Sequence, residues 1–278
     1  MEIGSDLLLR ASLKYLDRMS LKRDESLLII TEPPTDKGVS NALFDAALQM
    51  GANPILTMIP YRGEHNIEPP ATLAAAMKSA DAAITLIPYE SADFYTRPFL
   101  EMLQSGTRML GFLSPTVEKL ISLIYEHDFL VTDQICEALE EVISSAATIR
   151  ITSPGGTDIR AELGDRPVQT NPGRVSSPGE EGYLPPGVVG QAPLEESWEG
   201  KIVFDAFAYP VGVLRNPIHV EVQEGLVKKI SGGKEAQLFR EWLESRNDPN
   251  IYRTCHYGFG INPNLKRLSG LKFLDERM

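Results

Sequence analysis

The sequence has few of the residues from which metal and disulfide sites are built. Its 278 residues include two cysteines, Cys136 and Cys255, and four histidines. Two cysteines cannot form a disulfide framework, and their scarcity is expected of a protein in the reducing cytoplasm. The sequence has no paired Cys-x-x-Cys, no His-x-His and no His-Glu-x-x-His. Local spacing therefore identifies no metal site.

Several other signals are also missing. No apolar run approaches the about 18 residues that a membrane span needs, and the first residues do not form a secretory signal. The net charge of -11 and the pI of about 5.0 mean that the chain repels phosphate backbones. We therefore expect a cytoplasmic protein without a nucleic-acid or membrane partner. Because no Gly-x-Gly-x-x-Gly or P-loop pattern is present, we expect neither a dinucleotide nor a nucleoside triphosphate as a ligand.

Residues 1–147 alternate short apolar runs with segments of helical spacing. The runs are followed by Pro, Gly or Ser and lie at 27–30, 55–59, 82–87 and 109–113. Strands that are apolar throughout and alternate with helices indicate a parallel sheet covered on both faces. We therefore predict an α/β, doubly wound, Rossmann-like domain over residues 1–147.

Residues 148–278 have a different pattern. Two hairpins are predicted, at 149–163 and 218–230, and a helix at 234–245. Between them, residues 164–196 are rich in Gly, Pro and Ser, which indicates a long irregular segment. The second half is therefore predicted to be a separate, mixed α+β domain whose strands are mainly antiparallel.

Ligands of parallel sheets bind beyond the carboxyl ends of the strands. The loops expected at that edge contain Arg62 and Tyr89, which makes these two residues candidates for orienting a small-molecule substrate. The alternative is that both are ordinary surface residues of loops. The acid pairs 180–181 and 195–196 are more simply explained as solvated charges.

His256 lies in the run Cys-His-Tyr-Gly-Phe-Gly-Ile-Asn-Pro that begins at Cys255. Neutral imidazole is a frequent metal ligand and a frequent acid or base. The alternative reading is a hydrogen-bonded histidine of the core. In an extended chain successive side chains point to opposite faces, so Cys255 is expected to face away from His256, into the core.

Five segments in order resemble the aminopeptidase T/S family of metallopeptidases and its relative, 2,5-dihydroxypyridine 5,6-dioxygenase, an iron(II) enzyme that cleaves an aromatic ring. They are 156–160 (GTDIR), 184–193 (LPPGVVGQAP), 195–205 (EESWEGKIVFD), 232–236 (GGKEA) and 258–263 (GFGINP). Each motif alone is weak, whereas their ordered combination is fairly specific for the superfamily.

Two positions favour the dioxygenase branch. Where the peptidases have a metal-binding glutamate after Pro-x-Gly, this sequence has Val188, and where they have a second one it has His256. The resemblance implies that His256 is a metal ligand, that Fe(II) is the ion with Zn, Co or Mn as alternatives, and that the substrate is a hydroxypyridine. It also implies a homo-oligomer.

The family pattern continues beyond a segment similar to 275–277 (DER) with a glycine-rich strand and a His-x-Asp ligand pair, neither of which is among these residues. Three readings are therefore open. The chain is a dioxygenase whose other ligands come from elsewhere, a metallo-aminopeptidase with two ions, or a catalytically degenerate binding or scaffold subunit.

Overall fold

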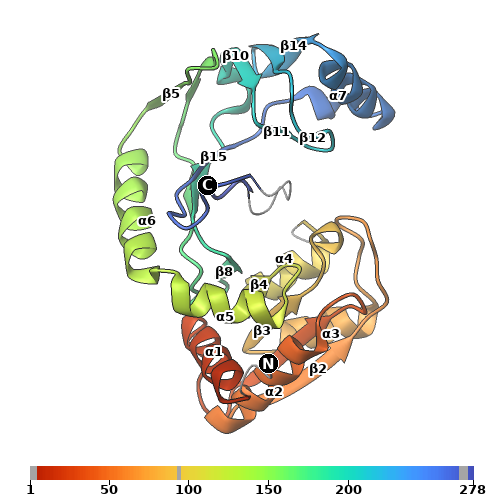
Figure 1. Ribbon diagram of the computed structural model, residues 1–278, viewed down its shortest axis with the longest axis vertical. Helices are drawn as coiled ribbons and strands as arrows, with labels where there is room; N and C mark the ends of the chain where they lie inside the picture. The colour runs from red at the N-terminus through yellow and green to blue at the C-terminus, as the bar shows by residue number, and fades with distance from the viewer. Residues whose placement is uncertain (1–4, 93–94, 269–274) are drawn as a thin grey trace. The chain divides into compact units, whose positions relative to one another are not determined.

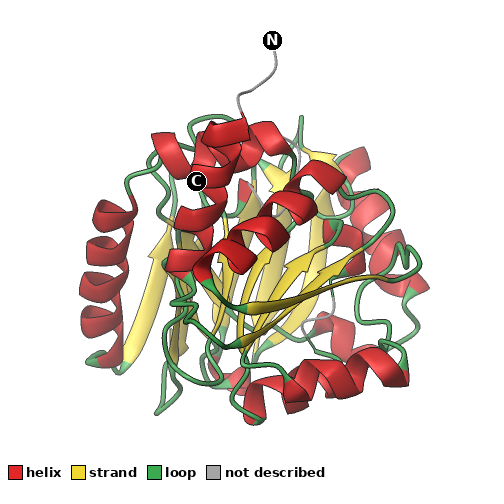
Figure 2. Ribbon diagram, turned by 90° about the horizontal axis from the view of Figure 1, so that it is seen from below, coloured by secondary structure: helices red, strands yellow, loops and turns green. Residues whose placement is uncertain are grey.

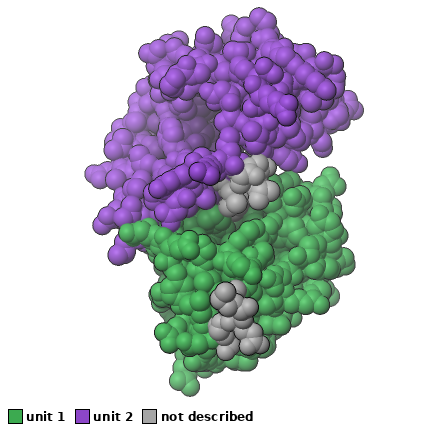
Figure 3. Space-filling model, in the orientation of Figure 1, with its two compact units in different colours: residues 1–129, 171–186 green, residues 130–170, 187–278 purple. Residues whose placement is uncertain are grey.

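The computed structural model describes residues 5–92, 95–268 and 275–278. The chain folds into two compact units, which are coloured separately in Figure 3. Unit 1 consists of Met1–Phe129 and Asn171–Pro186, and unit 2 consists of Leu130–Thr170 and Gly187–Met278. No helix within the described residues is long and apolar enough to cross a membrane.

The core of unit 1 is a parallel sheet of five strands in the order β2-β1-β3-β4-β8. Every residue of the third and fourth strands in this order is buried, as their continuous apolar runs predict. The strands are β1 (Ser26–Thr31), β2 (Asn53–Met58), β3 (Ala82–Leu86), β4 (Arg108–Phe112) and β8 (Glu181–Leu184). The predicted parallel sheet is therefore confirmed, and β8 adds a strand to it.

Helices cover both faces of this sheet, as Figure 1 shows for unit 1. One face carries α1 (Ser5–Arg18), α2 (Lys37–Met50) and α5 (Val117–Glu126), which share a core with β1 and β4. The other face carries α3 (Ala71–Ser79) and α4 (Arg97–Gln104). The doubly wound arrangement expected from the sequence is confirmed.

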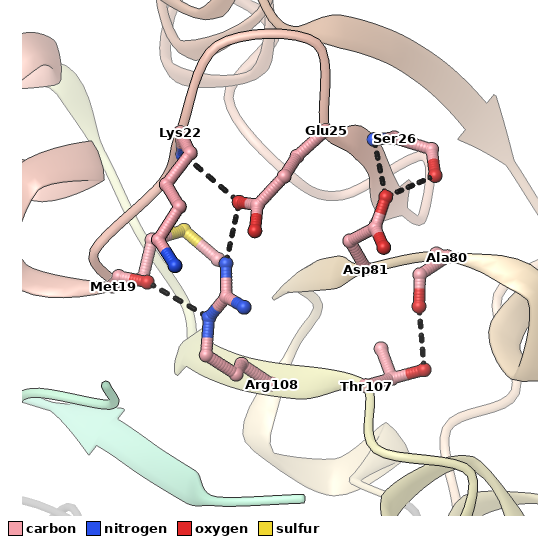
Figure 4. A network of polar contacts seen from close by, with 8 residues as sticks. All are labelled: Met19, Lys22, Glu25, Ser26, Ala80, Asp81, Thr107 and Arg108. Atoms are coloured by element: carbon pink, nitrogen blue, oxygen red, sulfur yellow. Dashed lines mark hydrogen bonds and ion pairs between the residues drawn. The ribbon is translucent and has the colours of Figure 1, made fainter. Parts of the chain in front are cut away.

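A polar network fixes the amino edge of the sheet (Figure 4). The Arg108 side chain is buried, donates from Nε to Met19 O at 3.2 Å and contacts Glu25 Oε2 through Nη2 at 2.6 Å. Asp81 accepts hydrogen bonds from the backbone N and the hydroxyl of Ser26, at 2.8 and 2.7 Å. These contacts connect the ends of α1, β1, β3 and β4.

Unit 2 contains a five-stranded antiparallel sheet in the order β14-β13-β10-β6-β5. Its strands are β5 (Thr148–Thr152), β6 (Asp158–Glu162), β10 (Glu199–Phe204), β13 (Ile218–Gln223) and β14 (Leu226–Gly232). Helix α7 (Lys234–Ser245) packs on β13 and β14. Figure 2 colours all helices and strands by type. The predicted antiparallel α+β architecture and both hairpins are confirmed.

Short elements complete unit 2. A small sheet joins β15 (Tyr257–Gly260), β9 (Val188–Gln191) and β7 (Val168–Asn171), and β11 (Phe207–Ala208) pairs with β12 (Gly212–Val213). Single 3₁₀ turns are η2 (Glu195–Ser197) and η3 (Pro249–Tyr252), and η1 (Tyr89–Ser91) lies in unit 1.

The two units differ from the expected division into 1–147 and 148–278. Helix α6 (Phe129–Ser144) packs with unit 2, because Cys136, Leu139 and Ile143 belong to that unit's core. Residues 171–186 return to unit 1, because β8 pairs with β4. The segment 164–196 was expected to be irregular, which is wrong: it contains β7, β8 and β9. These strands have four residues each and no continuous apolar run, so their pattern resembles that of a loop.

Candidate functional site

The candidate ligand His256 lies in unit 2, immediately before β15. Its side chain is exposed, and its Nδ1 is 2.9 Å from the Sγ of Cys255. The expectation that Cys255 faces away into the core is wrong, because the Cys255 side chain is also exposed. The alternation rule does not apply here, since residues 254–256 are irregular and the regular strand begins at Tyr257.

The contact between these two side chains changes the acidity of the thiol. The hydrogen bond with His256 lowers the pKa of Cys255, although partial burial and the nearby Glu195 carboxylate act in the opposite direction. A thiol of lowered pKa is more often present as the nucleophilic thiolate. The described residues thus place an exposed, activated thiol beside the candidate metal ligand.

Of the two motif positions that distinguish the family branches, Val188 begins β9, and His256 lies directly before β15, the strand that pairs with β9. Strand β15 pairs antiparallel with β9, with Gly258 opposite Gly190 and Gly260 opposite Val188. A Cβ atom on Gly258 would lie 3.3 Å from Cγ1 of Val188, so an apolar side chain borders the strand that follows His256. The segments 184–193 and 258–263, which are distant in the sequence, therefore pair in one sheet.

The backbones of β9 and β15 approach so closely that one position requires glycine. A Cβ atom on Gly190 would lie 2.0 Å from the carbonyl oxygen of Tyr257. The loop before β9 is fixed as well, since Ile261 N donates to Gly187 O at 2.9 Å and Gly187 has a φ of 109°. These contacts hold the segment that begins after His256.

The donor set fits a metal ion only in part. Among the described residues, no three His, Cys, Asp or Glu side chains come together in a group that could hold a metal ion. The other histidines are elsewhere: His65 packs edge to face against Tyr89, His127 is buried, and His219 is exposed on β13. Within the described chain, His256 is thus a single imidazole donor with a neighbouring thiol.

The two candidate substrate residues lie at the carboxyl edge of the sheet in unit 1. Arg62 Nε donates to Glu32 Oε1 at 2.8 Å, and Arg62 Nη1 donates to Ile67 O at 3.2 Å. Tyr89 is half-buried, and its backbone N donates to Ser114 Oγ at 3.2 Å. Arg62 and Tyr89 therefore do occupy the edge expected from the strand pattern, on loops that follow β2 and β3.

Sequence reasoning missed Glu32, which follows β1 directly. Its carboxylate is fully buried, and its Oε2 has no hydrogen-bond partner. The loops on both sides meet over this strand end, because Gly63 N donates to Ser91 Oγ at 3.0 Å and Asn66 N donates to Ala92 O at 2.9 Å. The sequence indicates Glu32 only as an acidic residue between an apolar strand and Pro-Pro, and this pattern is weak by itself.

The paired acids are engaged locally. Glu180 Oε2 accepts from the backbone N atoms of Ser176 and Ser177, at 2.6 and 2.9 Å, and Glu195 pairs with Arg166 at 2.9 Å. Glu195 also lines an open hollow of about 640 Å³ on unit 2 together with Glu162, Leu194, Glu196 and Ser197. Both acid pairs are exposed, as expected of solvated charges, although partial desolvation raises the pKa of Glu181.

Comparison with known proteins relates this geometry to a family. Residues 8–276 match the family model described as 2,5-dihydroxypyridine 5,6-dioxygenase. A protein of that name from Pseudomonas putida KT2440 is 26% identical over 257 residues, which are 86% of this chain and 71% of that protein.

Two solved structures share the fold. The 2,5-dihydroxypyridine dioxygenase of Pseudomonas putida KT2440 has a TM-score of 0.84 at 23% identity, over 95% of this chain and 79% of that chain. AmpT from Thermus thermophilus has a TM-score of 0.68 at 15% identity, over 98% and 83%. Since the family model covers nearly the whole chain, the protein belongs to the 2,5-dihydroxypyridine 5,6-dioxygenase family.

Proposed function

We propose that the protein is a metal-dependent, ring-cleaving dioxygenase that acts on a hydroxylated pyridine or a closely similar small molecule. The family match over residues 8–276 supports this activity. The observation that carries the proposal is that β9, which begins at Val188, pairs with β15, which begins directly after His256. An imidazole at one motif position and an apolar side chain at the other suit one ion of intermediate softness better than two ions held by carboxylates.

Fe(II) is the first candidate for the ion, and Zn, Co or Mn are alternatives. Imidazole is a suitable ligand for iron, and if Nδ1–H of His256 donates to a Cys255 thiolate, Nε2 would carry the lone pair that a metal ligand needs. One imidazole cannot hold a catalytic ion, and the described residues bring no group of three ligands together. The other ligands of the proposed ion would therefore come from outside the described residues or from another copy of the chain.

Unit 1 contributes a separate part of the proposal. Arg62 and Tyr89 are proposed to orient a small molecule at the carboxyl edge of its sheet, where such ligands generally bind. The ion pair with Glu32 holds Arg62 in one geometry. The Tyr89 ring, packed against His65, offers a flat surface for an aromatic ligand. A homo-oligomer in the cytoplasm is also proposed, and both cysteines are free thiols, which suits that compartment.

The decisive experiment is the metal content of the purified protein after anaerobic reconstitution, separately, with Fe(II), Zn(II) and Mn(II). We expect about one Fe per chain, and its loss in His256→Ala. The matched control is His219→Ala, because His219 is an exposed histidine on a strand of the same unit.

The possible results separate the three readings. Two Zn per chain with release of amino acids from short peptides would identify an aminopeptidase. Retention of iron in His256→Ala would contradict the assigned ligand. No stoichiometric metal in any reconstitution would indicate a binding or scaffold subunit. Ring cleavage is followed by the loss of aromatic absorbance, so it does not overlap with the peptidase assay.

A further inference from the structure

Three buried polar side chains in unit 2 have an atom without a hydrogen-bond partner. They are Gln191 on β9, Trp198 after η2, and Tyr257 on β15, which are 2, 4 and 7% exposed. The atoms concerned are Gln191 Oε1, Trp198 Nε1 and the Tyr257 hydroxyl. Buried polar atoms are nearly always paired, so each exception requires an explanation.

These three residues are neighbours. Gln191 and Tyr257 are directly opposite each other in the antiparallel pair of β9 and β15, so their side chains lie on the same face. The ring centroids of Trp198 and Tyr257 are 6.3 Å apart, in an edge-to-face arrangement. Of the five such atoms among the described residues, these three belong to this group of neighbouring side chains, and the other two, on Glu32 and Asn171, belong to unit 1.

The chemistry of the three atoms is complementary to a small molecule with donors and acceptors. Trp198 Nε1 is a donor, Gln191 Oε1 is an acceptor, and the Tyr257 hydroxyl is both. The amide of Gln191 cannot be turned over to change this, because its Nε2 donates to the backbone carbonyl of Arg166.

We propose that Gln191, Trp198 and Tyr257 form a buried hydration site that binds one or two internal water molecules. An internal water typically makes about three hydrogen bonds to polar groups that would otherwise be unpaired, and this cluster supplies three partners. Bound water would connect β9, β15 and the segment after η2. Its contact on β15 would be Tyr257, the residue that follows His256. The site is independent of the metal and of the proposed activity.

A single substitution tests the proposal by the sign of its effect. If the Tyr257 hydroxyl has no partner, Tyr257→Phe removes an unsatisfied polar group and raises the thermal midpoint. If the hydroxyl binds water, the same change removes one of the hydrogen bonds of that water and lowers the midpoint. We expect the midpoint of Tyr257→Phe to fall by roughly 2–4 °C. The control Tyr61→Phe should leave it unchanged, because Tyr61 is 51% exposed.

A high-resolution crystal structure of the intact protein gives the second readout. We expect a water peak within about 2.7–3.2 Å of at least two of the three atoms, and its loss or displacement in Tyr257→Phe. An unchanged or higher midpoint in Tyr257→Phe would overturn the proposal. A refined structure in which the three side chains pair with one another, without a water peak, would also overturn it.

Discussion

Arg62 Nε lies 2.8 Å from Glu32 Oε1, and the two side chains are 8% and 0% exposed. This is a buried ion pair that joins the loop after β2 to the end of β1. Removal of one partner leaves an uncompensated charge in the interior. We expect Arg62→Met to reduce the free energy of unfolding of unit 1 by about 3–5 kcal/mol, as measured by urea denaturation.

Two comparisons separate this effect from general sensitivity to the loss of an arginine. Arg97→Met removes an exposed pair with Glu101 and should cost at most about 1 kcal/mol. Combining Arg62→Met with Glu32→Gln should recover part of the lost unfolding free energy, because the second change removes the buried carboxylate that has no counter-charge. If Arg62→Met alone has no effect on stability, the pair is not buried in solution.

Cys255 and Cys136 should react very differently with a thiol reagent. Cys255 is exposed and its pKa is lowered by the hydrogen bond with His256, whereas Cys136 is 2% exposed. We expect iodoacetamide at pH 7 to label Cys255 alone in the native protein. His256→Ala should slow that labelling by up to about tenfold, because the thiolate fraction falls as the pKa rises.

Labelling is followed by mass spectrometry of tryptic peptides over time, and His219→Ala serves as the control. Labelling of Cys136 should begin only in denaturant. Equal labelling rates in the native protein and in His256→Ala would show that the 2.9 Å contact does not persist in solution.

Asp81 should contribute to the loss of stability in acid. Hydrogen bonds from the backbone N and the hydroxyl of Ser26 lower its pKa in the folded state. A carboxylate with a depressed folded pKa stabilises the fold above its unfolded pKa, which is about 3.9. That contribution is lost as the pH falls from there through the folded pKa.

The free energy of unfolding measured between about pH 2 and pH 6 checks this. Asp81→Asn should reduce the loss of unfolding free energy at acid pH. Ser26→Ala should reduce it only in part, because the backbone N of residue 26 still donates to Asp81. An identical pH dependence in the native protein and Asp81→Asn would contradict the prediction.

The sequence predicted those elements whose pattern is local. The apolar runs of β1, β3 and β4 and the helical spacing of α7 matched the structure closely. The strand β8 was missed because its residues, Glu-Gly-Tyr-Leu, form a strand only when they pair with β4, about 70 positions earlier in the sequence. A pattern within a short stretch of sequence carries no information about such a distant partner. For the same reason, the predicted boundary between the two units differs from the one that the structure shows.

The candidate site shows the same limit. His256 could be singled out from its motif, but its contact with Cys255 depends on an irregular backbone at residues 254–256, which alternation rules do not anticipate. Glu32 was missed because a carboxylate after an apolar strand is normally solvated. Only the fold shows that the loops with Ser91 and Asn66 close over it.

The pairing of β9 with β15 supplies a last prediction. Gly190 and Gly258 are directly opposite each other, yet their surroundings differ. A Cβ on Gly190 would meet the Tyr257 carbonyl oxygen at 2.0 Å, and a Cβ on Gly258 would meet Val188 Cγ1 at 3.3 Å. Backbone cannot give way as a side chain can, so Gly190→Ala should cost about 1–3 kcal/mol or more and Gly258→Ala much less.

Urea denaturation measures the effect of each substitution on the stability of unit 2. Metal retention after dialysis shows whether either substitution also disturbs His256. Because Tyr257 follows His256 directly, displacing its carbonyl group should also disturb the imidazole. We therefore expect Gly190→Ala to lose metal more readily than Gly258→Ala. Equal effects of the two substitutions on stability would mean that the strands are not paired in this register. A loss of stability in Gly190→Ala with unchanged metal retention would separate the register of the strands from the proposed role of His256.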